Sequence, residues 1–275
     1  MLDDHERVVA RHYQVSGLTQ RVLQAAAAAG LDTDRLTPAD LAPIDEFHIG
    51  GRIATKHAVA KMRLDGSERV LDIGCGIGGA ARYVAASTGC HVTGLDLTPE
   101  YVETARALSE RMGLGARMAF DAGSALQMPY ADAAFDAAIT LHVAMNIVDR
   151  AGLYREIARV LRSGAVFCIY DVMKGANDEL SYPLPWADTE ANSYLTTPAE
   201  MQVLLAAAGF SVEGVEDRTD FGIAFFRERL SAGAASPLGL HLLMGESARE
   251  KFHNMLQNLE NGAIAPVVML ARRTP

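Results

Sequence analysis

The chain has 275 residues, of which 49% are hydrophobic and 21% charged, a composition that suits a globular fold with a sizeable core and excludes a disordered chain. Its net charge of −9 at pH 7 argues against a broad electrostatic hold on nucleic acid. The three cysteines, Cys75, Cys90 and Cys168, form no CxxC pair. The sequence therefore indicates neither a disulfide framework nor a zinc site, and we expect no metal.

The N-terminal residues, MLDDHER, are charged and lack the apolar region of a signal peptide. No apolar run reaches the roughly 18 to 20 residues that a membrane-spanning helix needs. We therefore expect a cytoplasmic protein that binds neither membranes nor nucleic acids.

The first 63 residues favour helices separated by a loop. Residues 4–29 predict one helix, which ends in an alanine run and stops at Gly30. Residues 31–51 are typical of a loop and contain the segment PIDEFHIGGR, and residues 52–63 predict a second helix. We interpret residues 1–63 as an N-terminal helical cap.

Strands and helices alternate strictly from residue 64 to residue 172. The expected strands are apolar along almost their whole length, as in a parallel sheet that helices cover on both faces. They span residues 69–73, 91–95, 117–120, 135–141 and 165–172, and helices are expected at about 78–88, 99–112 and 150–162. The carboxyl ends of such strands are the usual ligand edge of an open sheet.

This alternation stops at residue 173. Residues 173–196 are rich in Pro, Asn and Tyr, and they contain the only tryptophan, Trp186. A capped helix, a strand, a helical insertion and a last strand are expected after them, at 197–209, 210–215, 220–261 and 264–271. We interpret residues 173–275 as a lid on the substrate side together with the last strands, and the whole chain, 1–275, as a single domain.

The segment 70–79, VLDIGCGIGG, carries the strongest functional signal. A buried strand turns into a helix through four glycines, which brings bare backbone N–H groups close to a ligand. Two patterns fit these glycines: GxGxxG, typical of dinucleotide sites, and D/ExGxGxG, typical of S-adenosylmethionine sites. The first pattern uses Gly74, Gly76 and Gly79, and the second uses Asp72, Gly74, Gly76 and Gly78. The first pattern predicts hydride transfer and the second predicts methyl transfer.

Two acidic residues bear on this choice. Asp96 ends the second strand, 20 residues after Gly76, where a carboxylate accepts hydrogen bonds from ribose hydroxyls in either cofactor class. Asp72 would approach the anionic pyrophosphate of a dinucleotide, which is unfavourable, but it would attract the ammonium and sulfonium groups of S-adenosylmethionine. The alternative interpretation of Asp72 is a turn carboxylate that caps the next helix. Asp72 therefore favours S-adenosylmethionine.

Downstream segments strengthen this interpretation. Residues 123–139, GSALQMPYADAAFDAAI, and 153–171, LYREIARVLRSGAVFCIYD, resemble class I S-adenosylmethionine-dependent methyltransferases of small molecules. The resemblance covers about residues 45–215. It implies an α/β fold: a Rossmann-like, seven-stranded, mostly parallel sheet with helices on both faces and an antiparallel last strand, in which residues 64–172 form the cofactor-binding core. It also implies cofactor contacts from Asp72, Gly74, Cys75, Gly76, Asp96, Leu97, Gly123, Ser124, Ala125 and Leu141.

Two positions depart from the family pattern. Ser124 stands where the family usually has an aspartate that contacts the adenine amine, so we expect binding to rely more on the backbone of Gly123 and Ala125. Residues 162–164, RSG, replace the usual PGG turn. The segments DEFHIGGR, PLPWAD and 220–261 resemble the group that contains the sarcosine and dimethylglycine methyltransferases. That likeness implies a sarcosine-type amine as one acceptor.

Methyl transfer needs no metal and no covalent nucleophile, but an N–H or O–H acceptor can need a general base. We expect His48, in the loop before the second helix, and His142, directly after the fourth strand, to be the catalytic histidines. Substrate contacts are expected from His48, Arg52, His142, Asn146 and Trp186. A surface loop position for His48 and a solvated Arg52 are the alternatives. Tyr13 and Arg227 are weaker candidates for the acceptor side.

Several alternatives stay open at this point. N-, O- and C-methylation all suit the residues, and the expected partner is a small-molecule methyl acceptor. An NAD(P)-dependent oxidoreductase would use the same glycine loop. A non-catalytic protein could keep the cofactor site and act as a partner of another protein. The sequence also leaves a homodimer open.

Overall fold

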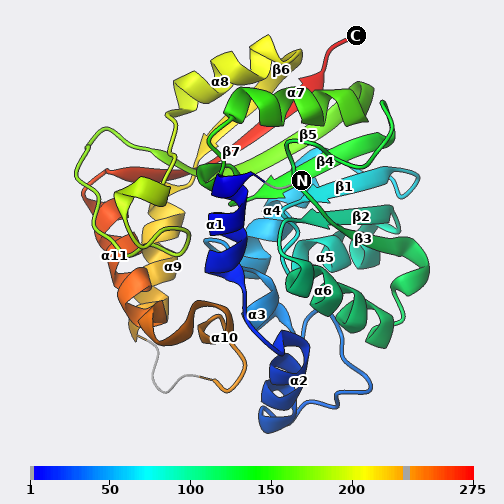
Figure 1. Ribbon diagram of the computed structural model, residues 1–275, viewed down its shortest axis with the longest axis vertical. Coiled ribbons are helices and arrows are strands. Elements are labelled where there is room, and N and C mark those ends of the chain that lie inside the picture. Colours follow the sequence, from blue (N-terminus) through cyan, green and yellow to red (C-terminus); the bar gives the residue numbers. More distant parts are fainter. Residues whose placement is uncertain (1–2, 232–235) are drawn as a thin grey trace.

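A seven-stranded sheet forms the centre of the structure, a computed structural model that describes residues 3–231 and 236–275 (Figure 1). The strands lie in the order β3–β2–β1–β4–β5–β7–β6. Their bounds are β1 Arg69–Ile73, β2 His91–Asp96, β3 Met118–Ala122, β4 Phe135–Leu141, β5 Leu161–Lys174, β6 Phe210–Asp217 and β7 Ile264–Arg273. Neighbours from β3 to β5 are parallel, whereas β7 runs antiparallel to β5 and β6. The predicted fold class is confirmed.

Different helices cover the two faces of the sheet, because side chains alternate along each strand. On β1, Val70 belongs to the apolar cluster of one face and Leu71 to that of the other. The first face carries α4 (Gly51–Met62), α5 (Gly79–Thr88), α6 (Pro99–Arg111) and, farther along the sheet, α9 (Thr219–Ser231) and α11 (Ala248–Glu260). The second face carries α7 (Arg150–Val160) and α8 (Pro198–Ala207).

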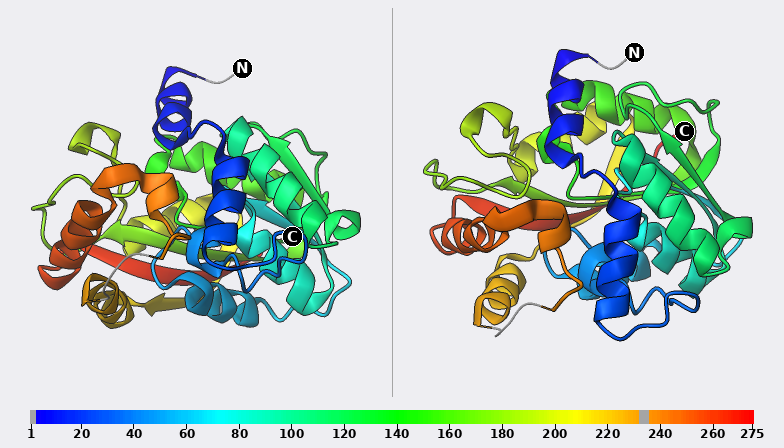
Figure 2. Two further views of the ribbon diagram at one scale, coloured as in Figure 1. Left: turned by 90° about the horizontal axis from the view of Figure 1, so that it is seen from below. Right: turned by 60° about the horizontal axis from the view of Figure 1, so that its bottom comes forward.

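The N-terminal segment differs from its prediction. The single helix expected over residues 4–29 is two helices, α1 (Asp4–Tyr13) and α2 (Leu18–Ala28), which both views of Figure 2 show as separate rods joined by a bend. Gly17 adopts φ +67°, a left-handed conformation that a continuing α-helix cannot include. α2 packs beside α6, and the short helix α3 (Ala42–Asp45) packs against α4 and α5, whereas no residue of α1 is buried.

The start of β5 also differs from its prediction. The helix expected over 150–162 ends at Val160, and the expected turn at 162–164 lies inside β5. Leu161 pairs with Phe135, and a register shift follows before the regular ladder resumes at Val166. A β-bulge of this kind accommodates extra residues in a strand, so β5 starts earlier than its apolar run.

The C-terminal part contains the predicted helical insertion. α9, α10 (His241–Met244) and α11 lie between β6 and β7, and α9 packs against α11. Thr197 and Glu200 form the predicted capping box at the start of α8. Within the described ranges, no helix is long and apolar enough to cross a membrane.

Candidate active site

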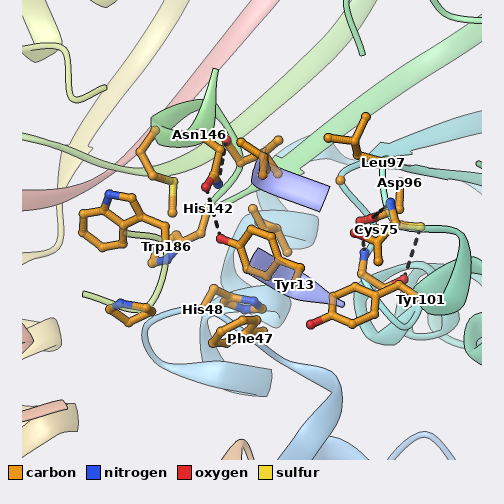
Figure 3. Close-up of a pocket in the computed structure, with 18 of the residues that line it drawn as sticks. Tyr13, Phe47, His48, Cys75, Asp96, Leu97, Tyr101, His142, Asn146 and Trp186 are labelled. Atoms are coloured by element: carbon orange, nitrogen blue, oxygen red, sulfur yellow. Dashed lines mark hydrogen bonds between the residues drawn. The ribbon is translucent and has the colours of Figure 1, made fainter. Parts of the chain in front are cut away.

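A cavity of about 400 Å³ opens at the edge where β1, β2 and β4 end. This is the edge at which open α/β sheets bind ligands. α1 crosses the cavity, and the helices of the C-terminal insertion, α9 and α11, close its far side. Figure 3 shows two parts of this cavity, with Cys75, Asp96 and Tyr101 on one side, and His48, His142 and Trp186 on the other. We call these parts the cofactor side and the acceptor side.

The glycine loop after β1 lines the cofactor side. Gly74 adopts φ +71°, and a Cβ there would lie 2.4 Å from Val143 Cγ2, so no larger residue fits without displacement of Val143. Gly76 also has a positive φ, of +54°, but a Cβ there would meet nothing within 4 Å, because the position faces open space. The loop thus leaves room for a ligand directly above its backbone.

Asp96, at the end of β2, is tied to this loop. Gly76 N–H donates to Asp96 Oδ2 and Thr98 N–H donates to Asp96 Oδ1, each at 2.8 Å. These two bonds fix the carboxylate at the cavity wall and leave further lone pairs on both oxygens. The arrangement can accept hydrogen bonds from the two hydroxyls of a ribose.

Asp72, at the tip of β1, is the most unusual acid of the cofactor side. Its side chain is buried, and its Oδ2 atom has no hydrogen-bond partner in the part of the chain that the structure describes. Burial, followed by the nearby carboxylates of Glu46 and Asp96, raises the pKa of Asp72 to about 7. A positively charged ligand group would relieve both effects. Asp72 therefore provides a place for a cation.

The charges around the cavity distinguish between the two cofactor classes. Asp72, Asp96, Asp45 and Glu6 line it, whereas no lysine or arginine of the described residues does. The six residues that the structure does not describe, 1–2 and 232–235, include no lysine or arginine either. A dinucleotide pyrophosphate would meet carboxylates without a cationic partner, but the ammonium and sulfonium of S-adenosylmethionine meet charges of opposite sign. The residues present fit S-adenosylmethionine.

The residues expected to contact the cofactor lie around this one cavity, with one exception. All except Ser124 line the cavity. The Ser124 hydroxyl donates to the carboxylate of Glu6, a residue of α1 that itself lines the cavity. The structure therefore brings a carboxylate from the N-terminal helix next to the position where the family usually has an aspartate. Sequence reasoning did not identify Glu6.

His142 begins the acceptor side, directly after β4. It has φ +56°, a conformation rare for a residue other than glycine. Its backbone N–H still donates to Tyr170 O, at 2.7 Å, so the backbone of His142 stays bonded to β5. The Nε2 atom of His142 is buried without a partner among the described residues. Burial, and then the neighbouring His48, lower the pKa of His142, so the ring is neutral near pH 7.

His48 faces His142 from the loop before α4. The two ring centroids are 5.9 Å apart, and the Tyr170 ring lies 4.9 Å from His142 and 6.2 Å from His48. His48 is buried rather than on a surface loop. Burial lowers its pKa, although the carboxylate of Glu46 opposes that effect. The structure thus brings together both predicted histidines.

The other predicted acceptor residues divide into two groups. Asn146 and Trp186 line the cavity, and Tyr13 of α1 donates from its hydroxyl to Asn146 Oδ1 at 3.2 Å (Figure 3). Arg52 does not line the cavity, because its guanidinium binds the carboxylate of Glu46 and, at 2.9 Å, Pro38 O. Arg227 pairs with Glu260 on the surface. The sequence shows no periodic pattern that would separate the residues that line the cavity from those that do not.

Several lining residues were not predicted. They are mostly apolar and come from the loop before α4, from α9 and α11, and from the segment around α10: Phe47, Ile49, Phe225, Phe226, Leu240, Leu243, Phe252 and Met255. Phe252 and Met255 belong to α11, within the helical insertion that the sequence predicts over 220–261. The sequence did not indicate that this insertion also borders the site.

Comparisons with known proteins agree with this geometry. Residues 71–169 match the family described as a methyltransferase domain. A sterol 24-C-methyltransferase of Gibberella zeae is 32% identical over 211 residues, which cover 72% of this chain and 56% of that protein. The chain spans about half the length of the curated relatives it matches.

Solved structures share the fold. A geranyl diphosphate C-methyltransferase of Streptomyces coelicolor has a TM-score of 0.73 at 17% identity, over 99% of this chain and 98% of that one. A Galdieria sulphuraria protein assigned as a sarcosine dimethylglycine methyltransferase has a TM-score of 0.62 at 18% identity, over 81% and 84%. The sheet order, the acid-lined glycine loop and the family match together identify residues 71–169 as a methyltransferase domain of the class I S-adenosylmethionine-dependent family.

Proposed function

We propose that this protein transfers the methyl group of S-adenosylmethionine to a small acceptor that has an apolar body and no anionic group. The observation that carries this proposal is the composition of the acceptor side, where aromatic and aliphatic side chains surround two neutral histidines and none of the described lining residues is a lysine or arginine. Pockets of this kind bind a ligand mainly through apolar contact and orient it with a few polar groups.

The lack of a lysine or arginine among the described lining residues argues against the sarcosine-type amine that the sequence suggested. Such an acceptor carries a carboxylate, which would lose its hydration on entry and would need a cationic partner. Arg52, an arginine expected to contact the substrate, is bound to Glu46 outside the cavity. The apolar walls instead favour a neutral ring or chain, and a buried area of about 150 Å² would contribute about 4 kcal/mol.

Each part of the site has a distinct task in this proposal. When bound, S-adenosylmethionine supplies an electrophilic methyl group on a positively charged sulfur. Asp72 binds its positive charge, Asp96 accepts hydrogen bonds from its ribose, and the glycine loop lets the backbone approach it. Tyr13 and Asn146 hold α1 across the cavity, which excludes water and keeps the acceptor in position.

Two measurements test the proposal. Calorimetric titration should show binding of S-adenosylhomocysteine and none of NADH; the reverse result would overturn the proposed cofactor. Release of S-adenosylhomocysteine should then be followed with acceptors in matched pairs, such as a naphthol and its carboxylated analogue, with sarcosine added as a third class. We expect at least about tenfold faster turnover of the neutral member, the effect of one uncompensated buried charge. Faster turnover of the carboxylates would refute the apolar acceptor.

A further inference from the structure

A buried polar chain connects Glu46 to His48 behind the acceptor side. The Glu46 side chain has no exposed surface, and its carboxylate accepts hydrogen bonds from Arg52 Nε and, at 2.5 Å, from Thr55 Oγ1. Thr55 Oγ1 lies 3.0 Å from His48 Nε2, and Glu46 Oε2 lies 3.6 Å from the same nitrogen. Neither Glu46 nor Thr55 lines the cavity.

The neighbours of His48 Nε2 determine which ring nitrogen carries the proton. Gly51 O, at 3.2 Å, and Glu46 Oε2 can only accept a hydrogen bond. The Thr55 hydroxyl has a single proton, which it donates to Glu46, so toward His48 it also acts as an acceptor. Three acceptors therefore face Nε2, and a neutral His48 must hold its proton there. The lone pair of the ring then lies on Nδ1.

His48 Nδ1 has no hydrogen-bond partner among the described residues, and the ring borders the cavity beside His142 (Figure 3). We propose that His48 Nδ1 is the base that takes the proton of the acceptor, and that Glu46 is a positioning residue that holds this tautomer through Thr55. This inference rests on the proposed methyl transfer. It restricts the acceptor to one whose reacting oxygen or nitrogen carries a hydrogen.

The proposed step conserves atoms and charge. A lone pair of the acceptor oxygen or nitrogen forms a bond to the methyl carbon, and the bond between that carbon and sulfur breaks with its electron pair left on sulfur. The acceptor's proton passes to His48 Nδ1, which makes the ring an imidazolium. The Nε2 proton of that imidazolium points at Glu46 and Thr55, so the new positive charge forms beside a buried carboxylate.

The groups around His48 explain why it suits this task better than His142. Glu46 and Arg52 face it from the loop and α4, His142 from the end of β4, and Tyr170 from β5. Glu46 is the one charged neighbour that stabilises the imidazolium, helped by the hydrogen bond to Gly51 O, whereas Arg52 and a protonated His142 would repel it. His142 has no comparable carboxylate, and nothing fixes its tautomer, since its Nε2 has no partner in the described ranges. A proton on His142 would therefore cost more.

The tautomer can be measured without knowledge of the acceptor. The protein labelled with ¹⁵N-histidine and saturated with S-adenosylhomocysteine should show neutral His48 protonated at Nε2, with assignment from the spectrum of His48→Asn. Thr55→Val has a similar shape but removes the hydroxyl, and it should lower the preference for the Nε2 proton about tenfold. Thr55→Ser restores a hydroxyl and should restore the preference. Glu46→Gln should lower the pKa of His48, because it removes the one charge that stabilises the imidazolium.

Glu216→Gln is the matched control, since Glu216 contacts His57 and Lys61 on another part of the surface, and the His48 signals should not change. Calorimetry with S-adenosylhomocysteine shows that each variant is folded. If wild type binds this ligand but His48 is protonated at Nδ1, or its pKa is the same in Glu46→Gln, the inference is wrong and the proposed function stands. If wild type does not bind it, the proposed function itself fails.

Discussion

Replacement of Asp72 by asparagine should weaken cofactor binding and stabilise the ligand-free protein. The two side chains have nearly the same shape, so the change removes a buried charge rather than volume. Burial and the carboxylates of Glu46 and Asp96 raise the pKa of Asp72 from its ordinary value of 3.8 to about 7. The folded protein therefore binds this proton more tightly than the unfolded chain does, and the free energy of unfolding falls as the pH rises from about 4 to 7.

The pKa of Asp72 sets the size of the effect on stability, and Coulomb's law sets that of the effect on binding. A pKa that rises from 3.8 to about 7 corresponds to about 4 kcal/mol at pH 8, where the carboxylate is ionised in both states. Asp72→Asn should recover up to that amount and raise the melting temperature of the ligand-free protein by several degrees. In the complex, a cation about 4 Å from the carboxylate gains about 4 kcal/mol at an effective dielectric constant of 20. We expect the variant to bind S-adenosylhomocysteine about 30- to 1,000-fold more weakly at pH 8.

Calorimetric titrations at pH 6 and pH 8 test this reasoning. Wild type should bind S-adenosylhomocysteine more tightly at pH 8, because Asp72 loses its proton between these values, whereas the affinity of Asp72→Asn should change little. The control ligand is 5′-methylthioadenosine, which lacks the ammonium group and should bind equally to both proteins. Equal affinities of wild type and variant for S-adenosylhomocysteine at both pH values would show that Asp72 does not bind the cofactor's positive charge.

Three further substitutions examine other parts of the structure. Asp96→Ala should weaken binding of S-adenosylhomocysteine by about 1–3 kcal/mol through loss of the ribose contacts, and an unchanged dissociation constant would refute that role. Gly74→Ala should lower the free energy of unfolding in urea by about 1–3 kcal/mol, because its Cβ would lie 2.4 Å from Val143 Cγ2 at a positive φ. Adding Val143→Ala to the same chain should recover part of this loss. No recovery would contradict the clash with Val143. Partial burial raises the pKa of Glu216, but hydrogen bonds from Lys61, His57 and Arg218 outweigh this effect and lower the pKa to about 2. The charge of Glu216 therefore stabilises the fold fully above pH 4.5, and this stabilisation is lost as the pH falls toward 2. Glu216→Gln should cost on the order of 1 kcal/mol at pH 7 and little at pH 2.5, and an equal loss at both values would contradict this account.

The strands could be predicted from the sequence because they are buried on both faces and leave continuous apolar runs. The bounds expected for β1 are those observed, Arg69–Ile73. The position of α1 could not be predicted in the same way, since none of its residues is buried. Polar contacts hold it over the cavity: Glu6 with Ser124, His5 Nε2 with Asn146 O at 2.8 Å, and Tyr13 with Asn146. Bonds between residues more than 100 positions apart leave no periodic pattern.

The cofactor side and the acceptor side also differ in how far the sequence predicts them. The glycine loop and Asp96 have a fixed spacing because one turn between strand and helix brings them together, so a motif describes them. Glu46, Thr55 and His48 meet only because the loop before α4 folds back on that helix. The apolar wall of the acceptor side belongs to α9 and α11, in an insertion that begins more than 75 residues after the end of β4. The hydrophobic pattern of this insertion indicates that it is buried, but not that it borders the site.

The two proposals together explain why the cavity is acidic although its acceptor side is apolar. Methyl transfer removes the positive charge of the sulfonium, so carboxylates that attract the cofactor would also oppose the reaction if that charge simply disappeared. A proton that passes from the acceptor to His48 creates a positive charge on the imidazolium, next to Glu46, as the charge on sulfur is lost. The carboxylates of Glu46, Asp72 and Asp96 then face the same total charge before and after the step. An acceptor without a transferable proton would leave that negative potential uncompensated, so the acids that select the cofactor also favour an acceptor with an O–H or N–H group.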